Sequence, residues 1–217
     1  MTHQIEWQES AVFPSVVYTL ECPEFLNSVA KVCAEALKES EALHPKLDEI
    51  YPVRMSKDLS NDHRLAEFTE YVGVAAWNIL SSQGYDVANA GISVLEFWCQ
   101  EHHKHSLMEQ HVHGRNAQLV GFYFLETPEN CSKLVVHDPR VAKMQIDLPQ
   151  VSMLQVSTSS SIINYDPAPG RLIITNAWLP HSFSRHAAEQ PIKFIHFNLG
   201  VQYQQPQTSQ TLNVEIV

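Results

Sequence analysis

The chain has 217 residues, of which 44% are hydrophobic and 18% charged, and its formal net charge is −10. This composition is typical of a folded protein, and the length allows one well-buried core or at most two small domains. The negative charge argues against a general nucleic-acid-binding protein, because such proteins need basic residues to neutralise phosphates.

Several classes of protein lack support in the sequence. Twelve histidines stand against only seven glycines, and neither a phosphate-binding glycine motif nor a GxSxG nucleophile motif occurs. The polar start MTHQIEWQES does not resemble a secretory signal, and no apolar run is long enough to span a membrane. The four cysteines are scattered without a Cys-x-x-Cys pair, which favours reduced thiols. We therefore expect a cytoplasmic protein that does not contact a membrane.

The first part of the chain predicts one extended segment and two helices. Residues 12–20 are rich in β-branched residues and predict an extended segment. Apolar residues at helical spacing, opened by a proline, predict a helix over residues 23–42. Residues 43–62 read as a long connection. Asp62 is placed to cap a second helix, and Gly84 is placed to end it.

After Gly91 the apolar pattern changes to that of strands separated by proline, glycine and polar clusters. Because no helices lie between these strands, an antiparallel sheet is expected rather than a parallel one. The predicted strands are residues 92–100, 118–125, 133–137, 159–165, 171–178 and 191–199.

These segments predict a mainly β (α+β) fold, an antiparallel jelly roll with the N-terminal helices packed on one sheet. We expect a single domain over residues 1–217. Residues 1–90 would form an N-terminal strand and supporting helices, residues 91–201 the jelly-roll core, and residues 202–217 a polar C-terminal tail.

Three histidines are the best candidates for chemistry. In the segment EQHVHGR, His111 and His113 are two residues apart, so on an extended strand both side chains point to the same face. A third ligand can come from His181 in the segment WLPHSFSR, which lies between two predicted strands. Imidazole groups bind iron, zinc, copper or nickel, so this set predicts a metal site without naming the metal.

From Trp98 to Asn198 the sequence resembles the 2-oxoglutarate/iron(II) oxygenases of bacteria and phages. Their motifs are a tryptophan, a His-x-His pair, a strand like SGVYYL, a DPR turn, a Pro-Gly turn and strand before a Pro-His, and a basic residue before Phe-Asn. The matching residues here, in the same order over about half of the chain, are Trp98, His111-Val112-His113, residues 120–125 (VGFYFL), Asp138-Pro139-Arg140, residues 169–174 (PGRLII), Pro180-His181, Lys193 and Phe197-Asn198.

The resemblance implies a double-stranded β-helix and an iron(II) ion held by His111, His113 and His181. It also implies 2-oxoglutarate as the cosubstrate, oxygen as the oxidant and hydroxylation of a C–H bond. The distal carboxylate of 2-oxoglutarate needs a cation in the pocket. Lys193 is the candidate for this role, and Arg185 is held in reserve.

Two positions depart from the wider superfamily. The pair His111–His113 stands where most members have His-x-Asp, which leaves the site more positively charged. Phe124 replaces the second tyrosine of the YYL element, and Tyr123 should point to the opposite face.

Other side chains are assigned structural roles at this stage. The histidines of the segment EHHKHS, His102, His103 and His105, are expected in a solvated loop near the site. His137 and His196 are expected to be structural histidines, and Trp98 and Trp178 to be core residues.

Two alternatives stay open. One is a cupin-type metal enzyme without 2-oxoglutarate, in which Gln118 stands where a glutamate ligand often follows. However, His181 comes eleven positions after Gly170, a larger spacing than is usual in cupins. The other is a non-catalytic metal-binding β-sandwich, whose site would be closed. The substrate, a small molecule or a protein side chain, and the oligomeric state do not follow from the sequence.

Overall fold

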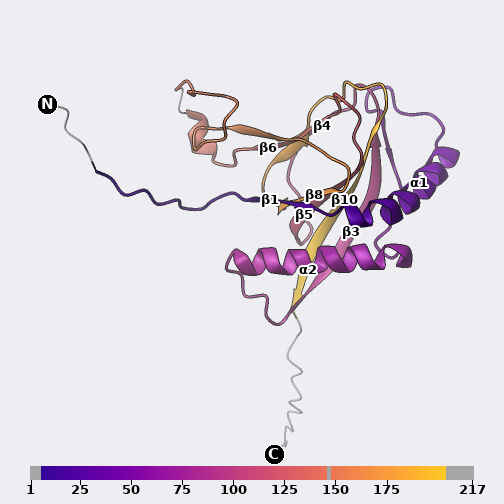
Figure 1. The fold of residues 1–217 in the computed structure, drawn as a ribbon, viewed down its shortest axis with the longest axis horizontal. Helices are drawn as coiled ribbons and strands as arrows, with labels where there is room; N and C mark the ends of the chain where they lie inside the picture. The colour runs from indigo at the N-terminus through magenta and orange to yellow at the C-terminus, as the bar shows by residue number, and fades with distance from the viewer. Residues whose placement is uncertain (1–5, 146–147, 204–217) are drawn as a thin grey trace, which may run out of the picture.

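The computed structural model describes residues 6–145 and 148–203. Two α-helices and ten strands account for most of them, with short 3₁₀ helices before each α-helix and after β6 (Figure 1). The strands are β1 (Val17–Glu21), β2 (Val53–Met55), β3 (Ala90–His102), β4 (Met108–His111), β5 (Ala117–Glu126), β6 (Leu134–His137), β7 (Ile162–Tyr165), β8 (Arg171–Asn176), β9 (His181–Phe183) and β10 (Ile192–Tyr203).

Both predicted helices are confirmed. They are α1 (Leu26–Leu43) and α2 (Ala66–Ser82), and each follows a single 3₁₀ turn. Asp62 caps the turn before α2, where its side chain accepts a hydrogen bond from the backbone N–H of Arg64 at 3.1 Å. Gly84 lies beyond the end of α2 with φ of +89°, a conformation that glycine adopts without strain.

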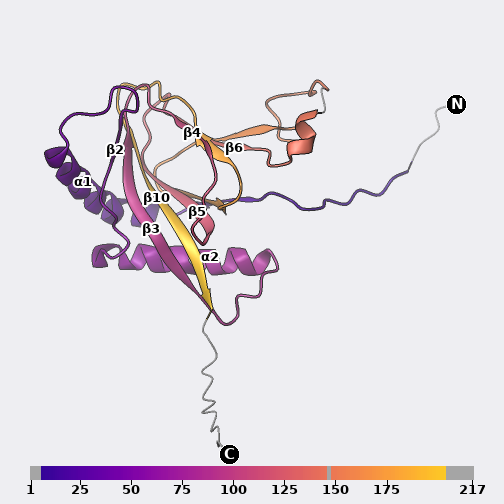
Figure 2. The same cartoon turned by 180° about the vertical axis from the view of Figure 1, so that it is seen from behind.

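The strands form two antiparallel sheets. The larger sheet has the order β1-β8-β5-β10-β3-β2, and the smaller sheet has the order β4-β9-β6-β7. The long strands β3 and β10 run side by side through the larger sheet, and Figure 2 shows them from behind. The predicted antiparallel arrangement is therefore confirmed, and the two facing sheets form a double-stranded β-helix.

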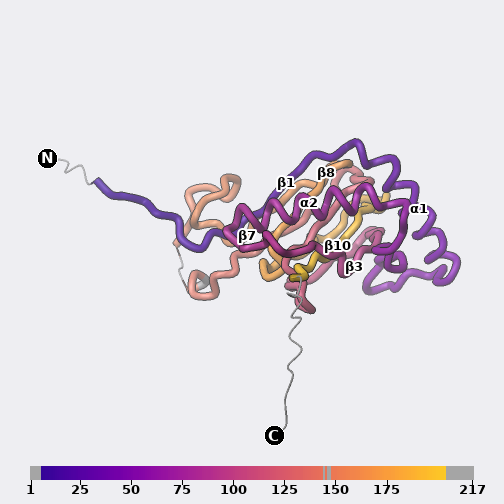
Figure 3. Tube along the Cα trace, turned by 90° about the horizontal axis from the view of Figure 1, so that it is seen from below, coloured from indigo at the N-terminus to yellow at the C-terminus, as the bar shows by residue number. Residues whose placement is uncertain are grey.

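The larger sheet is buried on both faces. Its outer face packs against α1 and α2, which both lie on that side of the sheet (Figures 1 and 3). Its inner face packs against the smaller sheet through a second cluster rich in phenylalanine. Along β10 the alternation is clear: Ile195 and Phe197 belong to the outer cluster, whereas Ile192 and Phe194 belong to the inner one.

All six predicted core strands are present, although their ends shift by a few residues. Of the predicted N-terminal extended segment, residues 12–20, only residues 17–20 pair with a sheet, in β1, which continues to Glu21. Three short strands, β2, β4 and β9, were not predicted, because their three or four residues show neither an alternating pattern nor a continuous apolar run. Of the predicted polar tail, Gln202 and Tyr203 end β10 and the rest lies outside the described residues. Among the described residues, no helix is long and apolar enough to cross a membrane.

Candidate metal centre

The register between two short strands brings two of the predicted ligands together. β4 and β9 pair antiparallel, and His111 lies directly opposite His181. Directly opposed residues on one face of a sheet have side chains close enough to interact, and here the two ring centroids are 4.6 Å apart. The pairing thus joins residues seventy positions apart in the chain.

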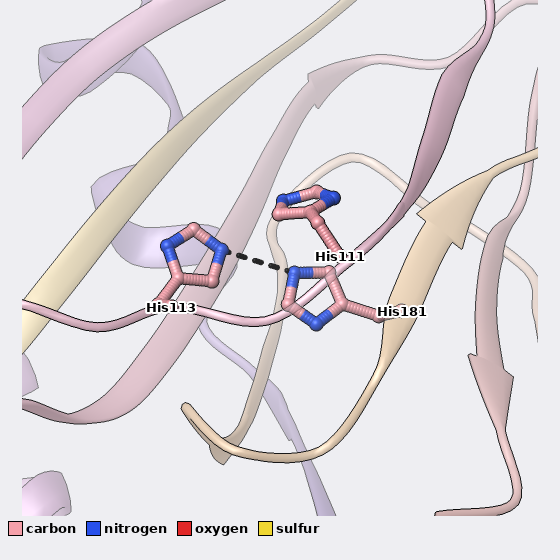
Figure 4. A group of neighbouring side chains, drawn as sticks. All are labelled: His111, His113 and His181. Atoms are coloured by element: carbon pink, nitrogen blue, oxygen red, sulfur yellow. Dashed lines mark hydrogen bonds between the residues drawn. The ribbon is translucent and has the colours of Figure 1, made fainter.

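His113 completes the group just after the end of β4. Its backbone N–H donates to the carbonyl of Ala177 at 2.9 Å, which holds this segment against the chain leaving β8. The Nε2 atoms of His113 and His181 are 3.1 Å apart, and the two rings are nearly parallel (Figure 4). All three imidazoles offer a nitrogen within 4.8 Å of the others.

Backbone carbonyls orient two of the rings. The Nδ1–H of His181 donates to the carbonyl of Leu179 at 2.9 Å, and the Nδ1–H of His111 donates to the carbonyl of Glu109 at 2.8 Å. A hydrogen bond from Nδ1 leaves Nε2 without a proton in the neutral ring, which is the form that binds a metal. Both rings are therefore set to coordinate through Nε2.

Burial keeps two of these histidines, His113 and His181, neutral. His181 is fully buried, and this burial lowers its pKa to about 3. Burial, with a smaller contribution from His111, lowers the pKa of His113 to about 4. Protons therefore compete weakly for these nitrogens at neutral pH.

The group fits a transition-metal ion. Metal–imidazole bonds are about 2.0–2.1 Å long, so two neighbouring ligands at right angles on one ion lie about 3 Å apart. The separation of 3.1 Å between the Nε2 atoms of His113 and His181 agrees with that arrangement. Three ligands on one side of the ion would leave its other positions open.

Two pockets open beside His113. One has a volume of about 450 Å³ and is polar, with Glu96, Arg115 and Asn198 in its wall. The other has a volume of about 310 Å³ and an aromatic wall that includes Tyr85 and Trp178. Both pockets also touch Ala117, so they meet at the start of β5. A substrate can therefore approach the site from either side.

Lys193 is not brought to the histidines. It lies on β10 two positions before Ile195, so both side chains face outward, toward the helices. Its Nζ is 3.1 Å from a carboxylate oxygen of Glu126 and 3.6 Å from one of Glu101. The inward-facing positions nearest to it carry Ile192 and Phe194. The reserve candidate, Arg185, is exposed on the connection between β9 and β10.

Tyr123 and Phe124 face as predicted. Tyr123 points toward the helices, and its hydroxyl donates to the carbonyl of Cys22 at 2.8 Å. Phe124 packs in the inner cluster. Gln118, which the cupin alternative would place near the metal, accepts a hydrogen bond from the backbone N–H of Val201 at 2.7 Å.

Sequence reasoning missed two inward-facing residues beside the ligands. His196, expected to be structural, is almost fully buried, and its ring centroid is 5.0 Å from that of His113. Trp98 lies directly opposite His196 on β3, with the ring centroids 5.2 Å apart. The buried atoms Nδ1 of His196 and Nε1 of Trp98 have no hydrogen-bond partner among the described residues. Strand alternation could have indicated an inward position for His196, because His196 and Asn198 share one face of the predicted strand.

The segment EHHKHS was also misplaced in part. His102 is fully buried at the end of β3, where its Nε2 is 2.9 Å from Oε1 of Gln100 and its ring packs on Phe194. The expected solvated loop begins only after it. His102 was misread because three nearby histidines and a lysine suggest a polar loop, whereas the strand extends two residues beyond the predicted end.

Comparisons with known proteins agree with this geometry. Residues 96–198 match the model of the family described as "Putative 2OG-Fe(II) oxygenase". The chain has no match among the curated proteins.

Solved structures share the fold at low sequence identity. AviO1 from Streptomyces viridochromogenes Tue57 is 11% identical with a TM-score of 0.60, over 86% of this chain and 90% of that one. A prolyl-4-hydroxylase from Pseudomonas putida is 11% identical with a TM-score of 0.57, over 85% and 93%. HygX from Streptomyces hygroscopicus, solved with nickel and 2-oxoglutarate bound, is 14% identical with a TM-score of 0.51, over 86% and 82%.

The matched segment contains all three histidines of the metal-binding group and all four strands of the smaller sheet. Residues 96–198, just under half of the chain, are therefore similar to the 2OG-Fe(II) oxygenase family.

Proposed function

We propose that the protein is an iron(II)- and 2-oxoglutarate-dependent dioxygenase that hydroxylates a substrate not yet identified, with iron held by His111, His113 and His181. The observation that carries this proposal is the convergence of three imidazole nitrogens within 4.8 Å at the mouth of a double-stranded β-helix. The match of residues 96–198 to this family's model supports iron and 2-oxoglutarate as the cofactors.

When bound, the metal and 2-oxoglutarate supply the oxidising power, and oxygen is the oxidant. The protein's part is to bind, orient and exclude water. The carbonyls of Leu179 and Glu109 hold two of the ligand rings in the orientation that presents Nε2. Phe122 packs edge-on against His181, with centroids 5.4 Å apart, and so keeps water from that side of the ligand.

The substrate would enter through the two pockets that meet at His113. The polar pocket offers Glu96 and Arg115, and the aromatic pocket offers flat apolar surfaces. A prolyl-4-hydroxylase among the similar structures supports a protein side chain as the substrate class, and a small molecule is the other class that pockets of this size accept. A cytoplasmic location is part of the proposal, since Cys22, Cys33, Cys99 and Cys131 are free thiols.

Turnover of 2-oxoglutarate without added substrate tests the proposal. Purified protein given iron(II), oxygen and 2-oxoglutarate should form succinate slowly, and omission of any one of the three should stop it. His181→Ala should abolish succinate formation, whereas His63→Ala, a change of an exposed histidine on the 3₁₀ turn before α2, should not. Iron binding without any succinate would contradict the proposal and favour the cupin-type alternative.

A further inference from the structure

The inner face of the larger sheet carries buried ring nitrogens that lack a partner among the described residues, and two of them belong to directly opposed residues. Trp98 and His196 are directly opposed on β3 and β10, and both side chains face inward. Nε1 of Trp98 and Nδ1 of His196 are buried and make no hydrogen bond within the described part of the chain. A buried polar group without a partner costs about 1–3 kcal/mol, so each such atom calls for a ligand.

These two atoms lie next to the metal-binding group. The ring centroids of His181 and His113 are 5.1 Å apart, those of His113 and His196 are 5.0 Å apart, and those of His196 and Trp98 are 5.2 Å apart. The four rings thus form a continuous row from the metal ligands to β3. A keto acid bound to the metal has only a five-carbon chain, so its second carboxylate must lie among residues that pack directly around the ligands.

The neighbouring polar groups limit which residues could bind this second carboxylate. Nδ2 of Asn198 donates a hydrogen bond to a carboxylate oxygen of Glu96 at 2.6 Å, so this amide is already paired with a carboxylate of the protein. Lys193, the cation expected for the cosubstrate, faces the helices and is paired with Glu101 and Glu126. On the inner face of β10, Ile192 and Phe194 offer no polar atom. Nδ1 of His102 also lacks a partner, but it lies four residues along β3 from Trp98, where its ring packs on Phe194. Trp98 and His196 are therefore the donors without a partner in the row of rings next to the metal-binding group.

We infer that Trp98 and His196 hold the distal carboxylate of 2-oxoglutarate through hydrogen bonds from Nε1 and Nδ1, in place of a lysine or arginine. The inference rests on the proposed function. A carboxylate is an acceptor, so it matches the indole N–H and the Nδ1–H tautomer of a neutral imidazole. The site then recognises the distal carboxylate by two neutral donors in a dry environment rather than by an ion pair.

The test compares two keto acids of equal chain length. 2-Oxopentanoate has a methyl group where 2-oxoglutarate has its distal carboxylate, so the ratio of their dissociation constants reports on the distal contact alone. Both are measured anaerobically on the iron(II)-loaded protein through the visible charge-transfer band of the chelated keto acid. The wild-type protein should bind 2-oxoglutarate at least about tenfold more tightly than 2-oxopentanoate, the value of one buried hydrogen bond to a charged group.

Trp98→Phe removes the N–H and keeps an aromatic ring. It should weaken 2-oxoglutarate binding about tenfold and leave 2-oxopentanoate binding within about twofold, with iron stoichiometry unchanged. His196→Phe should act in the same way, and Trp98→Phe alone carries the test if that second variant does not fold. Trp77→Phe is the matched control, because Trp77 donates its Nε1–H to the carbonyl of Val87, away from the inner face.

Three results would decide against the inference. Equal binding of 2-oxoglutarate by Trp98→Phe and by the wild type would mean that the indole N–H does not hold the distal carboxylate. Loss of discrimination in Lys193→Met would return the role to Lys193. A wild-type protein that gives no band with either keto acid would contradict the proposed function itself, and the inference would fall with it.

Discussion

His111 and His181 occupy directly opposed positions in the antiparallel pair of β4 and β9, with their rings 4.6 Å apart. The metal centre therefore depends on the register of two strands of only four and three residues. A shift of one residue would turn one of the two side chains to the other face of the sheet. His113, 3.1 Å from His181 between Nε2 atoms, lies on the same chain segment as His111 and depends on the same pairing.

Replacement of a ligand should remove the metal without unfolding the protein. His111→Ala and His181→Ala are each expected to reduce bound iron from one equivalent to near zero, because two imidazoles hold a divalent ion far more weakly than three. Elemental analysis after gel filtration measures the stoichiometry. Full occupancy in both variants would show that the metal binds elsewhere.

Gly121 should tolerate no side chain. It lies opposite Phe197 in the pairing of β5 and β10, and an added Cβ would lie 2.1 Å from Cζ of that ring. Gly121→Ala should lower the free energy of unfolding by about 1–3 kcal/mol, because the close-packed outer core must shift. Urea denaturation measures this loss.

Gly73→Ala is the matched control for that prediction. Gly73 lies within α2 and has open space around its Cα. An alanine there should stabilise the helix by about 1 kcal/mol. Equal effects of the two substitutions would contradict the packing derived for the outer face.

Buried His102 should make the protein less stable in acid. Burial, then the neighbouring His186 and His103, lower its pKa to about 3, whereas an unfolded chain has a histidine pKa near about 6.5. Between these values the unfolded chain binds the proton and the folded chain does not. The stability is therefore full above about pH 6.5 and is lost as pH falls toward 3.

His102→Gln removes this titration. The free energy of unfolding, measured with a chelator at pH 7 and pH 5, should fall less between the two values in the variant than in the wild type. The difference should approach about 1.4 kcal/mol per pH unit. An equal loss of unfolding free energy between pH 7 and pH 5 in both proteins would mean that His102 takes up a proton in the folded state. The control is His63→Gln, a change on the exposed 3₁₀ turn before α2. Its free energy of unfolding should fall between pH 7 and pH 5 by as much as that of the wild type.

Lys193→Met should have a small structural effect. Lys193 keeps a quarter of its side chain exposed and pairs with Glu101 and the more exposed Glu126. Partly exposed ion pairs of this kind contribute up to about 1 kcal/mol. Thermal unfolding should show a loss within that limit, with iron stoichiometry unchanged, and a loss of iron would contradict the outward position of Lys193.

Much of the fold and the grouping of the three histidines could be predicted, and the reason is physical. Long strands such as β5 and β10 have enough apolar residues to be recognised, and the His-x-His spacing places two imidazoles on one side of an extended segment. The third ligand was found through its setting between two strong strands. The pairing that unites the three could not be predicted, because β4 and β9 are too short to show a pattern.

The orientation of β10 explains where the side chains of Lys193 and His196 lie. This strand is apolar on both faces, so alternation alone does not tell which face meets the helices. Lys193 and His196 are an odd number of positions apart, so they must point to opposite faces. The structure turns His196 toward the ligands and Lys193 away from them.

The most direct test of the central claim is an anaerobic titration of the metal-free protein with iron(II) and then with 2-oxoglutarate. The account predicts a weak visible charge-transfer band at one equivalent of iron, present in the wild type and in His63→Ala and absent in His111→Ala. A band that persists in His111→Ala would contradict the assignment of the metal centre. Iron bound by the wild type without any band would contradict 2-oxoglutarate as the cosubstrate.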